Sequence, residues 1–298
     1  MVKSPVTGEK SKLVKIIKTD YIESLYKISL NYNVHPFFNT DTISLYRCCK
    51  TGYKFYYPLD IKANNEFYQN IENFDWYYQT WKWDYDKAIT EINLGDNVLE
   101  VGCGRGYFLS ELQKRGNDVV GVELNENAIE FAKQNNIKVL NTSLDEIKDE
   151  KFDVICSFQV LEHINNVENF ITDCCRLLKT NGKLIFTVPN NDAFFFKSNK
   201  LIKKSNESYI NQLQTVALNM PPHHMGLWNL KSLKKMQKVF PLQVICIDEE
   251  TNNSRNFLNN QILRDRYPNK YIRKVFQMLY RRSLKRGDSI FVVYKKLS

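Results

Sequence analysis

The sequence predicts an α/β fold built on a doubly wound, largely parallel sheet of seven strands with an antiparallel last strand. Three observations predict it. From Asp96 onward, short apolar runs alternate with helix-length amphipathic stretches, which is the pattern of β-α-β units. A glycine-rich turn follows the first apolar run, as ligand-binding folds of this class require. The last run follows Arg286-Gly287-Asp288, so the final two strands can pair as antiparallel neighbours at a sheet edge.

The elements expected from this alternation follow in chain order. Strands are expected at residues 97–101, 119–123, 138–141, 154–157, 183–188, 242–248 and 289–294. Helices are expected at residues 108–115, 127–134, 167–178 and 230–239. Asn181-Gly182 is expected to end the third helix and to start the next strand by turn chemistry.

Three regions interrupt the alternation. Residues 1–95 form an N-terminal extension ahead of a domain at residues 96–298, and residues 190–228 and 251–287 are insertions in that domain. Ligands of open α/β sheets bind beyond the carboxyl ends of the strands. Because both insertions are attached in the C-terminal half of the fold, we expect these additions to determine substrate specificity.

Composition favours a cytoplasmic globular protein. The chain has 298 residues, of which 43% are hydrophobic, so it can bury a substantial core. No stretch approaches the roughly 20 apolar residues that cross a bilayer, and no signal peptide is recognisable at the start. The seven cysteines are odd in number and include two vicinal pairs, a pattern that indicates a reducing compartment.

The positive charge is confined to one end of the chain. Residues 261–298 carry 11 Lys or Arg and 2 Asp or Glu, which accounts for the whole formal charge of +9. A basic protein raises nucleic acid as a partner, but here the excess belongs to the tail and not to the fold. We therefore expect nucleic acid to be an unlikely partner.

The glycine-rich turn reads Glu100-Val101-Gly102-Cys103-Gly104-Arg105-Gly106. Glycines allow the backbone to approach a nucleotide closely. In a dinucleotide site they fall as G-x-G-x-x-G, whereas here the third glycine comes one place early. Glu100 would repel a pyrophosphate but attracts the ammonium group of a methionine moiety, directly or through water. These features favour S-adenosylmethionine, which has no phosphate.

A second acidic residue supports the same cofactor. Glu123 closes the second strand, 21 residues beyond Gly102. A carboxylate at that place can accept hydrogen bonds from both ribose hydroxyls of an adenosine. An ordinary turn followed by a surface glutamate explains neither this spacing nor the early third glycine.

With these motifs the sequence resembles the class I S-adenosylmethionine-dependent methyltransferases, which have a Rossmann-like seven-stranded sheet. The resemblance runs from about residue 96 to residue 248, resumes at the last strand, and includes Val160-Leu161-Glu162-His163-Ile164. It implies an intact enzyme and not a binding module. The family often has an acid where Ser143 stands, so a backbone carbonyl or the Ser143 hydroxyl is expected to contact adenine instead. The cofactor residues that the resemblance implies are Glu100, Gly102, Cys103, Gly104, Glu123, Leu124, Ser143, Leu144, Phe158 and Gln159.

Two histidines are the candidate catalytic residues. Pro221 and Pro222 stiffen the backbone ahead of His223 and His224. A hydroxyl acceptor must lose its proton as the methyl group is transferred, and an imidazole can take that proton. The alternative is that both rings only order the loop, because positioning alone can supply much of the rate. His163 is less suited as a base, since the resemblance makes its Glu-His pair structural.

The histidine loop and Val188-Pro189-Asn190 resemble the branch of the family that methylates sugars and glycan or glycolipid precursors. Residues 46–58 resemble the zinc-ribbon-like leader of such enzymes, but Thr51 replaces the second cysteine of a C-x-x-C pair, so we expect no zinc and no other metal site. We therefore expect O-methylation of a sugar, glycan or glycolipid acceptor. The alternatives are a quinone-like or other small-molecule acceptor and, third, RNA, whose base-methylating enzymes carry an Asn/Asp-Pro-Pro-aromatic run where Ser157-Phe158-Gln159-Val160 stands.

Two further segments have open roles. Thirteen of the 39 aromatic residues lie between Tyr53 and Tyr85. They form either an acceptor platform, for which residues 75–78 are the first candidates, or a hydrophobic cover on the sheet.

In the basic tail, apolar residues repeat at helical spacing beside Arg281, Arg282, Lys285 and Arg286. Such a helix either lies on the inner, anionic surface of the membrane or packs its apolar stripe, formed by Ile272, Val275, Phe276 and Leu279, on the protein's own sheet.

Overall fold

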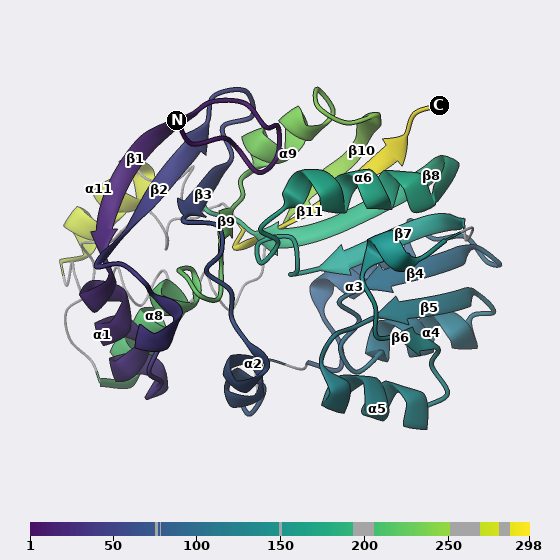
Figure 1. Ribbon diagram of the computed structural model, residues 1–298, viewed down its shortest axis with the longest axis horizontal. Coiled ribbons are helices and arrows are strands. Elements are labelled where there is room, and N and C mark those ends of the chain that lie inside the picture. Colours follow the sequence, from purple (N-terminus) through teal and green to yellow (C-terminus); the bar gives the residue numbers. More distant parts are fainter. Residues whose placement is uncertain (75–76, 78, 149–150, 193–205, 251–268, 280–286) are drawn as a thin grey trace.

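Two sheets organise the chain. The computed structural model describes residues 1–74, 77, 79–148, 151–192, 206–250, 269–279 and 287–298. One sheet has seven strands in the order β10-β11-β8-β7-β4-β5-β6, and the other has four in the order β1-β2-β3-β9. Figure 1 shows the two sheets side by side, with helices covering both faces of the larger one.

The seven-stranded sheet confirms the predicted fold class. Strands β4 to β8 run parallel to their neighbours, and β11 lies antiparallel between β8 and β10. The last two strands therefore pair as the sequence predicts, with β10 at the edge. The strands are β4 (Asn97–Val101), β5 (Asp118–Val122), β6 (Val139–Leu140), β7 (Phe152–Phe158), β8 (Leu178–Pro189), β10 (Leu242–Glu249) and β11 (Ser289–Lys296).

Three helices of this domain, α5, α6 and α9, begin at an asparagine whose side chain caps them. The Asn125 side chain accepts hydrogen bonds from two backbone N–H groups at the start of α5, and Asn166 caps α6 in the same way. The four predicted helices are all present, and their ends differ from the prediction by at most three residues. The helices are α3 (Trp83–Ile89), α4 (Tyr107–Lys114), α5 (Glu126–Gln134), α6 (Val167–Leu177) and α9 (Leu230–Met236), with a 3-10 turn, η2, at Leu144–Glu146.

The prediction that Asn181-Gly182 ends a helix is wrong. Helix α6 passes directly into β8 at Leu178, whose side chain is buried in the core. Asn181 has a φ of 64°, and the register between β7 and β8 shifts over the preceding residues. The pair therefore makes a bulge inside β8, a place that favours the left-handed conformation as strongly as a helix end does.

The N-terminal extension and the first insertion build the second sheet together. Strand β9 (Gly226–Leu227) from the insertion pairs antiparallel with β3 (Lys54–Tyr57) from the extension. A Cβ on Gly226 would lie 2.2 Å from the Tyr53 hydroxyl oxygen, so only glycine fits this contact. The other elements are β1 (Ser11–Lys18), α1 (Thr19–Leu30), η1 (His35–Phe37), β2 (Thr42–Cys48), α2 (Asn65–Ile71) and α8 (Asn206–Leu218).

These elements share one apolar core. Side chains of α1, α2 and α8 pack together with residues that lead into β9. In this core Tyr26 of α1 donates a hydrogen bond to the Met220 carbonyl, 2.9 Å away, at the start of the histidine loop. The extension therefore fixes the loop that carries the predicted catalytic residues.

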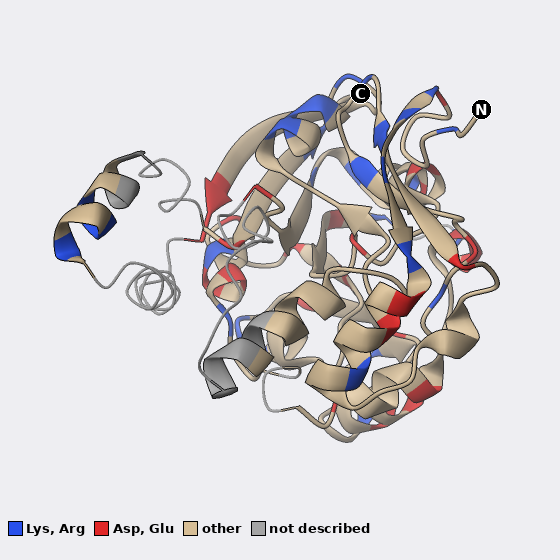
Figure 2. Ribbon diagram, turned by 90° about the vertical axis from the view of Figure 1, so that its left-hand side faces the viewer, with Lys and Arg blue, Asp and Glu red and all other residues tan. Residues whose placement is uncertain are grey.

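Helix α11 (Lys270–Leu279) stands away from both sheets (Figure 2). Its apolar residues Tyr271, Ile272, Val275 and Met278 are exposed, so these four do not pack on the sheet. The basic residues predicted to act beside them, Arg281, Arg282, Lys285 and Arg286, lie outside the described residues. Among the residues that the structure describes, no helix has both the length and the apolar character to cross a bilayer. Membrane binding stays a prediction.

Candidate active site

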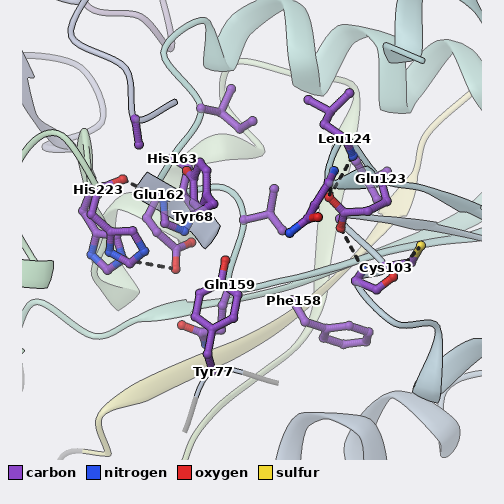
Figure 3. A pocket seen from close by; sticks show the side chains of 18 of the residues that line it. Tyr68, Tyr77, Cys103, Glu123, Leu124, Phe158, Gln159, Glu162, His163 and His223 are labelled. Carbon is purple, nitrogen blue, oxygen red and sulfur yellow. Dashed lines mark hydrogen bonds and ion pairs between the residues drawn. The ribbon is translucent and has the colours of Figure 1, made fainter. Parts of the chain in front are cut away.

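A cavity of 1410 Å³ opens at the carboxyl ends of the parallel strands. It is lined by the glycine-rich turn, by the ends of β5 and β7, by aromatic residues of the extension and by the histidine loop. Figure 3 shows these side chains converging from opposite sides. A typical small-molecule pocket has about 300–1,000 Å³, so this cavity has room for two reactants at once.

The glycine-rich turn forms one wall of the cavity. The backbone φ angles of Gly102, Gly104 and Gly106 are 73°, 52° and 74°, a region that strains any other residue. A Cβ on Gly102 would also lie 2.5 Å from a Val160 methyl group. The turn is fixed to the next strand, since Gly102 N–H and Cys103 N–H both donate to the Val122 carbonyl, at 2.8 and 3.1 Å.

Glu123 lies at the end of β5 beside this turn. One carboxylate oxygen accepts a hydrogen bond from Gly104 N–H at 2.8 Å. The other accepts from the N–H groups of Leu124 and Asn125, at 2.7 and 2.9 Å. The carboxylate is thus fixed in orientation, faces the cavity, and retains a lone pair on Oε2 for a further donor such as a ribose hydroxyl. The Leu124 side chain is exposed at the cavity rim.

Two buried carboxylates lie on the other side of the turn. Glu100 is 1% exposed and does not line the cavity, and its Oε2 has no hydrogen-bond partner among the described residues. Asp84 of α3 does line the cavity; its Oδ2 accepts from the Thr187 hydroxyl at 2.8 Å, while its Oδ1 is likewise without a partner in the described structure. Burial raises the pKa of both carboxyls, and the Lys82 ammonium opposes the rise. Sequence reasoning missed Asp84.

These features fit S-adenosylmethionine. The unpartnered oxygen of Asp84 is on a residue that lines the cavity and is suited to a cationic group, and the fixed Glu123 carboxylate is suited to a ribose hydroxyl. The glycine turn leaves no room for a Cβ at Gly102. A pyrophosphate would meet acidic residues here and not the basic groups that would attract it.

The remaining predicted cofactor residues line the same cavity. Ser143 precedes η2, and its side chain caps that turn, while Leu144 is buried under it. Phe158 ends β7 and packs edge-on against Tyr85, with ring centroids 5.1 Å apart. Gln159 follows with a φ of 58°, and its N–H donates to the Thr187 carbonyl at 2.9 Å.

The two predicted catalytic histidines lie at the far end of the cavity, and the structure adds a third. His223 and His224 are stacked with their ring centroids 4.5 Å apart. His163, which the sequence resemblance made structural, lies 4.6 Å from the first ring and 4.9 Å from the second. Burial lowers the pKa of all three imidazoles, which favours their neutral forms. Each ring lines the cavity.

Glu162 lies beside this cluster of three histidines. Its carboxylate is 1% exposed, and one oxygen lies 3.9 Å from His224 Nε2. Its other oxygen has no hydrogen-bond partner among the described residues. Burial raises the pKa of the Glu162 carboxyl to about 8.

Aromatic residues of the extension line the space between the two ends. Tyr68, Tyr77, Trp81 and Trp83 face the cavity, whereas Tyr53 is fully buried against Trp228, with ring centroids 4.1 Å apart. Tyr53 fits the interpretation of a hydrophobic cover, whereas the role of the four cavity-lining rings as an acceptor platform stays a prediction. Of residues 75–78, the structure describes only Tyr77.

A family model described as "Methyltransferase domain" matches residues 76–247, more than half of the chain. The chain belongs to this methyltransferase family. The predicted enzyme class, a methyltransferase with S-adenosylmethionine as cofactor, is thereby confirmed at the level of the family. The glycan branch is not shown by the match.

Curated relatives match a shorter segment. The chain is 33% identical over 113 residues to a ubiquinone biosynthesis O-methyltransferase of Rickettsia akari (strain Hartford), covering 36% of this chain and 43% of the relative. It is 36% identical over 104 residues to a protein of the same name from Coxiella burnetii (strain Dugway 5J108-111), covering 32% of this chain and 44% of the relative. The chain thus spans less than half the length of these relatives.

Solved structures of methyltransferases are similar at low sequence identity. Coclaurine N-methyltransferase bound to N-methylheliamine and SAH has a TM-score of 0.47 at 14% identity, with 71% of each chain covered. An S-adenosylmethionine-dependent methyltransferase from Mesorhizobium loti has a TM-score of 0.49 at 12% identity, with 72% of this chain and 97% of that chain covered.

Proposed function

We propose that the protein transfers the methyl group of S-adenosylmethionine to a hydroxyl of a small, quinone-like acceptor such as a dihydroxyphenol. The observation that carries the proposal is the single cavity that joins the glycine turn and Glu123 to the three histidines. The names of the curated relatives, ubiquinone biosynthesis O-methyltransferases, support this acceptor class. No comparison supports the sugar acceptor that the sequence favoured.

The cofactor end of the cavity holds and orients the methyl donor. When bound, S-adenosylmethionine supplies a methyl group on a positively charged sulfur. Glu123 accepts a hydrogen bond from the ribose, and Asp84, which lines the cavity, attracts the ammonium group directly or through water. Ser143, Leu144, Phe158 and Gln159 border the rest of this end.

The acceptor end provides flat apolar surfaces and a proton acceptor. The rings of Tyr68 and Tyr77 line this part of the cavity and can stack on a planar acceptor. A phenolic hydroxyl loses its proton as the new O–CH₃ bond forms. His223 and His224 line the same cavity, and burial lowers the pKa of both rings, so their neutral forms are candidates to accept it.

An acceptor panel tests the proposal. The purified protein is incubated with methyl-labelled S-adenosylmethionine and, separately, a dihydroxyphenol, a sugar nucleotide and an RNA oligonucleotide. We expect label in the dihydroxyphenol and an equal amount of S-adenosylhomocysteine, with Glu123→Ala as the inactive control. Labelling of the sugar nucleotide alone, or of the RNA alone, would show that the acceptor assignment is wrong.

A further inference from the structure

We propose that His163, His223, His224 and Glu162 form a binding site for a divalent transition-metal ion of the zinc class. One potential ligand nitrogen from each histidine lies within 4.8 Å of those of the other two. A carboxylate oxygen of Glu162 lies 3.9 Å from His224 Nε2. Figure 3 shows His163, His223 and Glu162 grouped on one side of the cavity, facing the cofactor residues. Three imidazoles and one carboxylate are a common ligand set for zinc.

The hydrogen bonds of the rings indicate where their protons lie. His163 Nδ1–H donates to the His223 carbonyl at 2.6 Å, and His223 Nδ1–H donates to the Leu218 carbonyl at 3.0 Å. A carbonyl oxygen can only accept, so in both rings a proton is on Nδ1. The lone pair on Nε2 of the neutral His223 ring is therefore available, whereas the His163 ring also has the Gln159 backbone as a hydrogen-bond partner.

The third ring follows the same pattern. His224 Nδ1 lies 3.2 Å from Asn219 Oδ1. The Asn219 amide is oriented by its own Nδ2, which donates to Asn191 Oδ1 at 2.9 Å, so its oxygen faces the ring as an acceptor. An imidazole that binds a metal almost always donates its other N–H to such an oxygen, which fixes the ring. All three histidines have that second partner.

Glu162 offers a carboxyl group to a cation bound at this site. Its carboxylate is buried beside three neutral rings, and its Oε2 has no hydrogen-bond partner among the described residues. A buried carboxylate is costly unless it is paired or coordinates a metal. Its backbone is held in place, because the Glu162 carbonyl accepts from Met225 N–H at 2.9 Å and from Gly226 N–H at 2.8 Å. These bonds join the segment after β7 to the histidine loop.

The geometry requires a small closure on binding. Ligand atoms around a tetrahedral ion with bonds of 2.0–2.1 Å lie about 3.4 Å apart. In this structure the distances between the three histidine nitrogens reach up to 4.8 Å. Ring rotations at His163 and His224 can supply the difference. Nitrogen ligands favour zinc and neighbouring transition metals over magnesium and calcium, which take oxygen ligands.

The ion would face the acceptor. The three rings line the cavity, so a fifth ligand or an exchangeable one can come from that space. A metal-bound hydroxyl has a strongly lowered pKa, so with the ion bound the metal would activate the acceptor in place of a histidine base. This role rests on the proposed function, whereas the binding of the ion does not.

Metal content tests the site without any activity measurement. Full-length protein without an affinity tag is stripped with a chelator, equilibrated with Zn²⁺, freed of excess metal, and analysed by mass spectrometry for zinc per chain. We expect one ion per chain in the wild type and in His35→Ala, since His35 is the other histidine of the chain and lies exposed, far along the sequence. We expect loss of the ion in His163→Ala and in His224→Ala.

Two milder variants keep the test valid if those proteins fail to fold. Asn219→Ala leaves all three imidazoles in place and removes the amide that fixes His224 and contacts Asn191, and such changes weaken metal binding about 10- to 100-fold. Glu162→Gln keeps the shape and removes the charge, and should also weaken Zn²⁺ binding. Wild-type protein without zinc, or zinc retained equally in all four variants, would overturn the proposal. Zinc bound in the absence of methyl transfer would instead count against the proposed function alone.

Discussion

Replacing Glu123 by Ala should weaken cofactor binding more than any other single change in the glycine-turn region. The carboxylate is fixed by N–H groups of Gly104, Leu124 and Asn125, which leaves about one of its four lone pairs for a ligand in the cavity. A hydrogen bond to a charged group is worth about 1.5–3 kcal/mol, and a ribose hydroxyl would lose this acceptor. The loss of about 1.5–3 kcal/mol corresponds to about a 10- to 150-fold weaker affinity.

Calorimetry with S-adenosylhomocysteine measures this effect directly. The matched control is Glu130→Ala, an exposed glutamate on the next helix that does not line the cavity. It should bind like the wild type, and both variants should show wild-type circular dichroism. Affinity of Glu123→Ala within threefold of wild type would refute the assignment of the ribose to Glu123, and tighter binding of NAD than of S-adenosylhomocysteine to the wild type would refute the choice of cofactor.

Three further predictions test other parts of the account. Gly102→Ala adds a Cβ 2.5 Å from Val160, whereas Gly95 has a similar φ of 79° and open space around its Cβ position. The midpoint temperature of thermal unfolding should therefore fall further for Gly102→Ala than for Gly95→Ala. Equal shifts in that temperature would show that the contact with Val160 costs no stability. His223→Ala or His224→Ala should lower turnover about 100-fold or more with little change in cofactor affinity, and near-normal turnover of both single variants and the double variant would make the loop structural. The exposed apolar face of α11 predicts flotation with anionic vesicles that fades with salt and is lost on Ile272→Ser; equal recovery with neutral vesicles, or none, would exclude this surface role.

The seven-stranded sheet was predictable because its signals are local. Each parallel strand is buried on both faces and forms a short apolar run in the sequence. In each helix, apolar residues recur every three or four positions. The Asn181-Gly182 turn was placed wrongly because the same dipeptide serves a helix end and a strand bulge. The four-stranded sheet could not be predicted, since β9 has only two residues and pairs with β3 across more than 160 positions of the chain.

In the site, too, the sequence reveals what local spacing determines and not the contacts between distant positions. Glu123 and the glycine turn are 21 positions apart on adjacent strands of one β-α-β unit, so their spacing alone indicates a nucleoside site. His163 and His223 are 60 positions apart, and nothing in the sequence shows that the fold brings their rings to 4.6 Å. The prediction of no metal site rests on the missing cysteine near Thr51. That spacing carries no information on three histidines that only the fold brings together. Asp84 lies on a short helix ahead of the glycine turn and has no motif of its own.

The most direct test of the account is a crystal structure of the protein with S-adenosylhomocysteine and a dihydroxyphenol bound together. The account predicts the ribose hydroxyls within hydrogen-bond distance of Glu123 and the phenol in the same cavity, with one hydroxyl next to the side chains of His163, His223 and His224 and facing the sulfur. A phenol bound elsewhere on the protein, or a cofactor whose ribose does not contact Glu123, would contradict it.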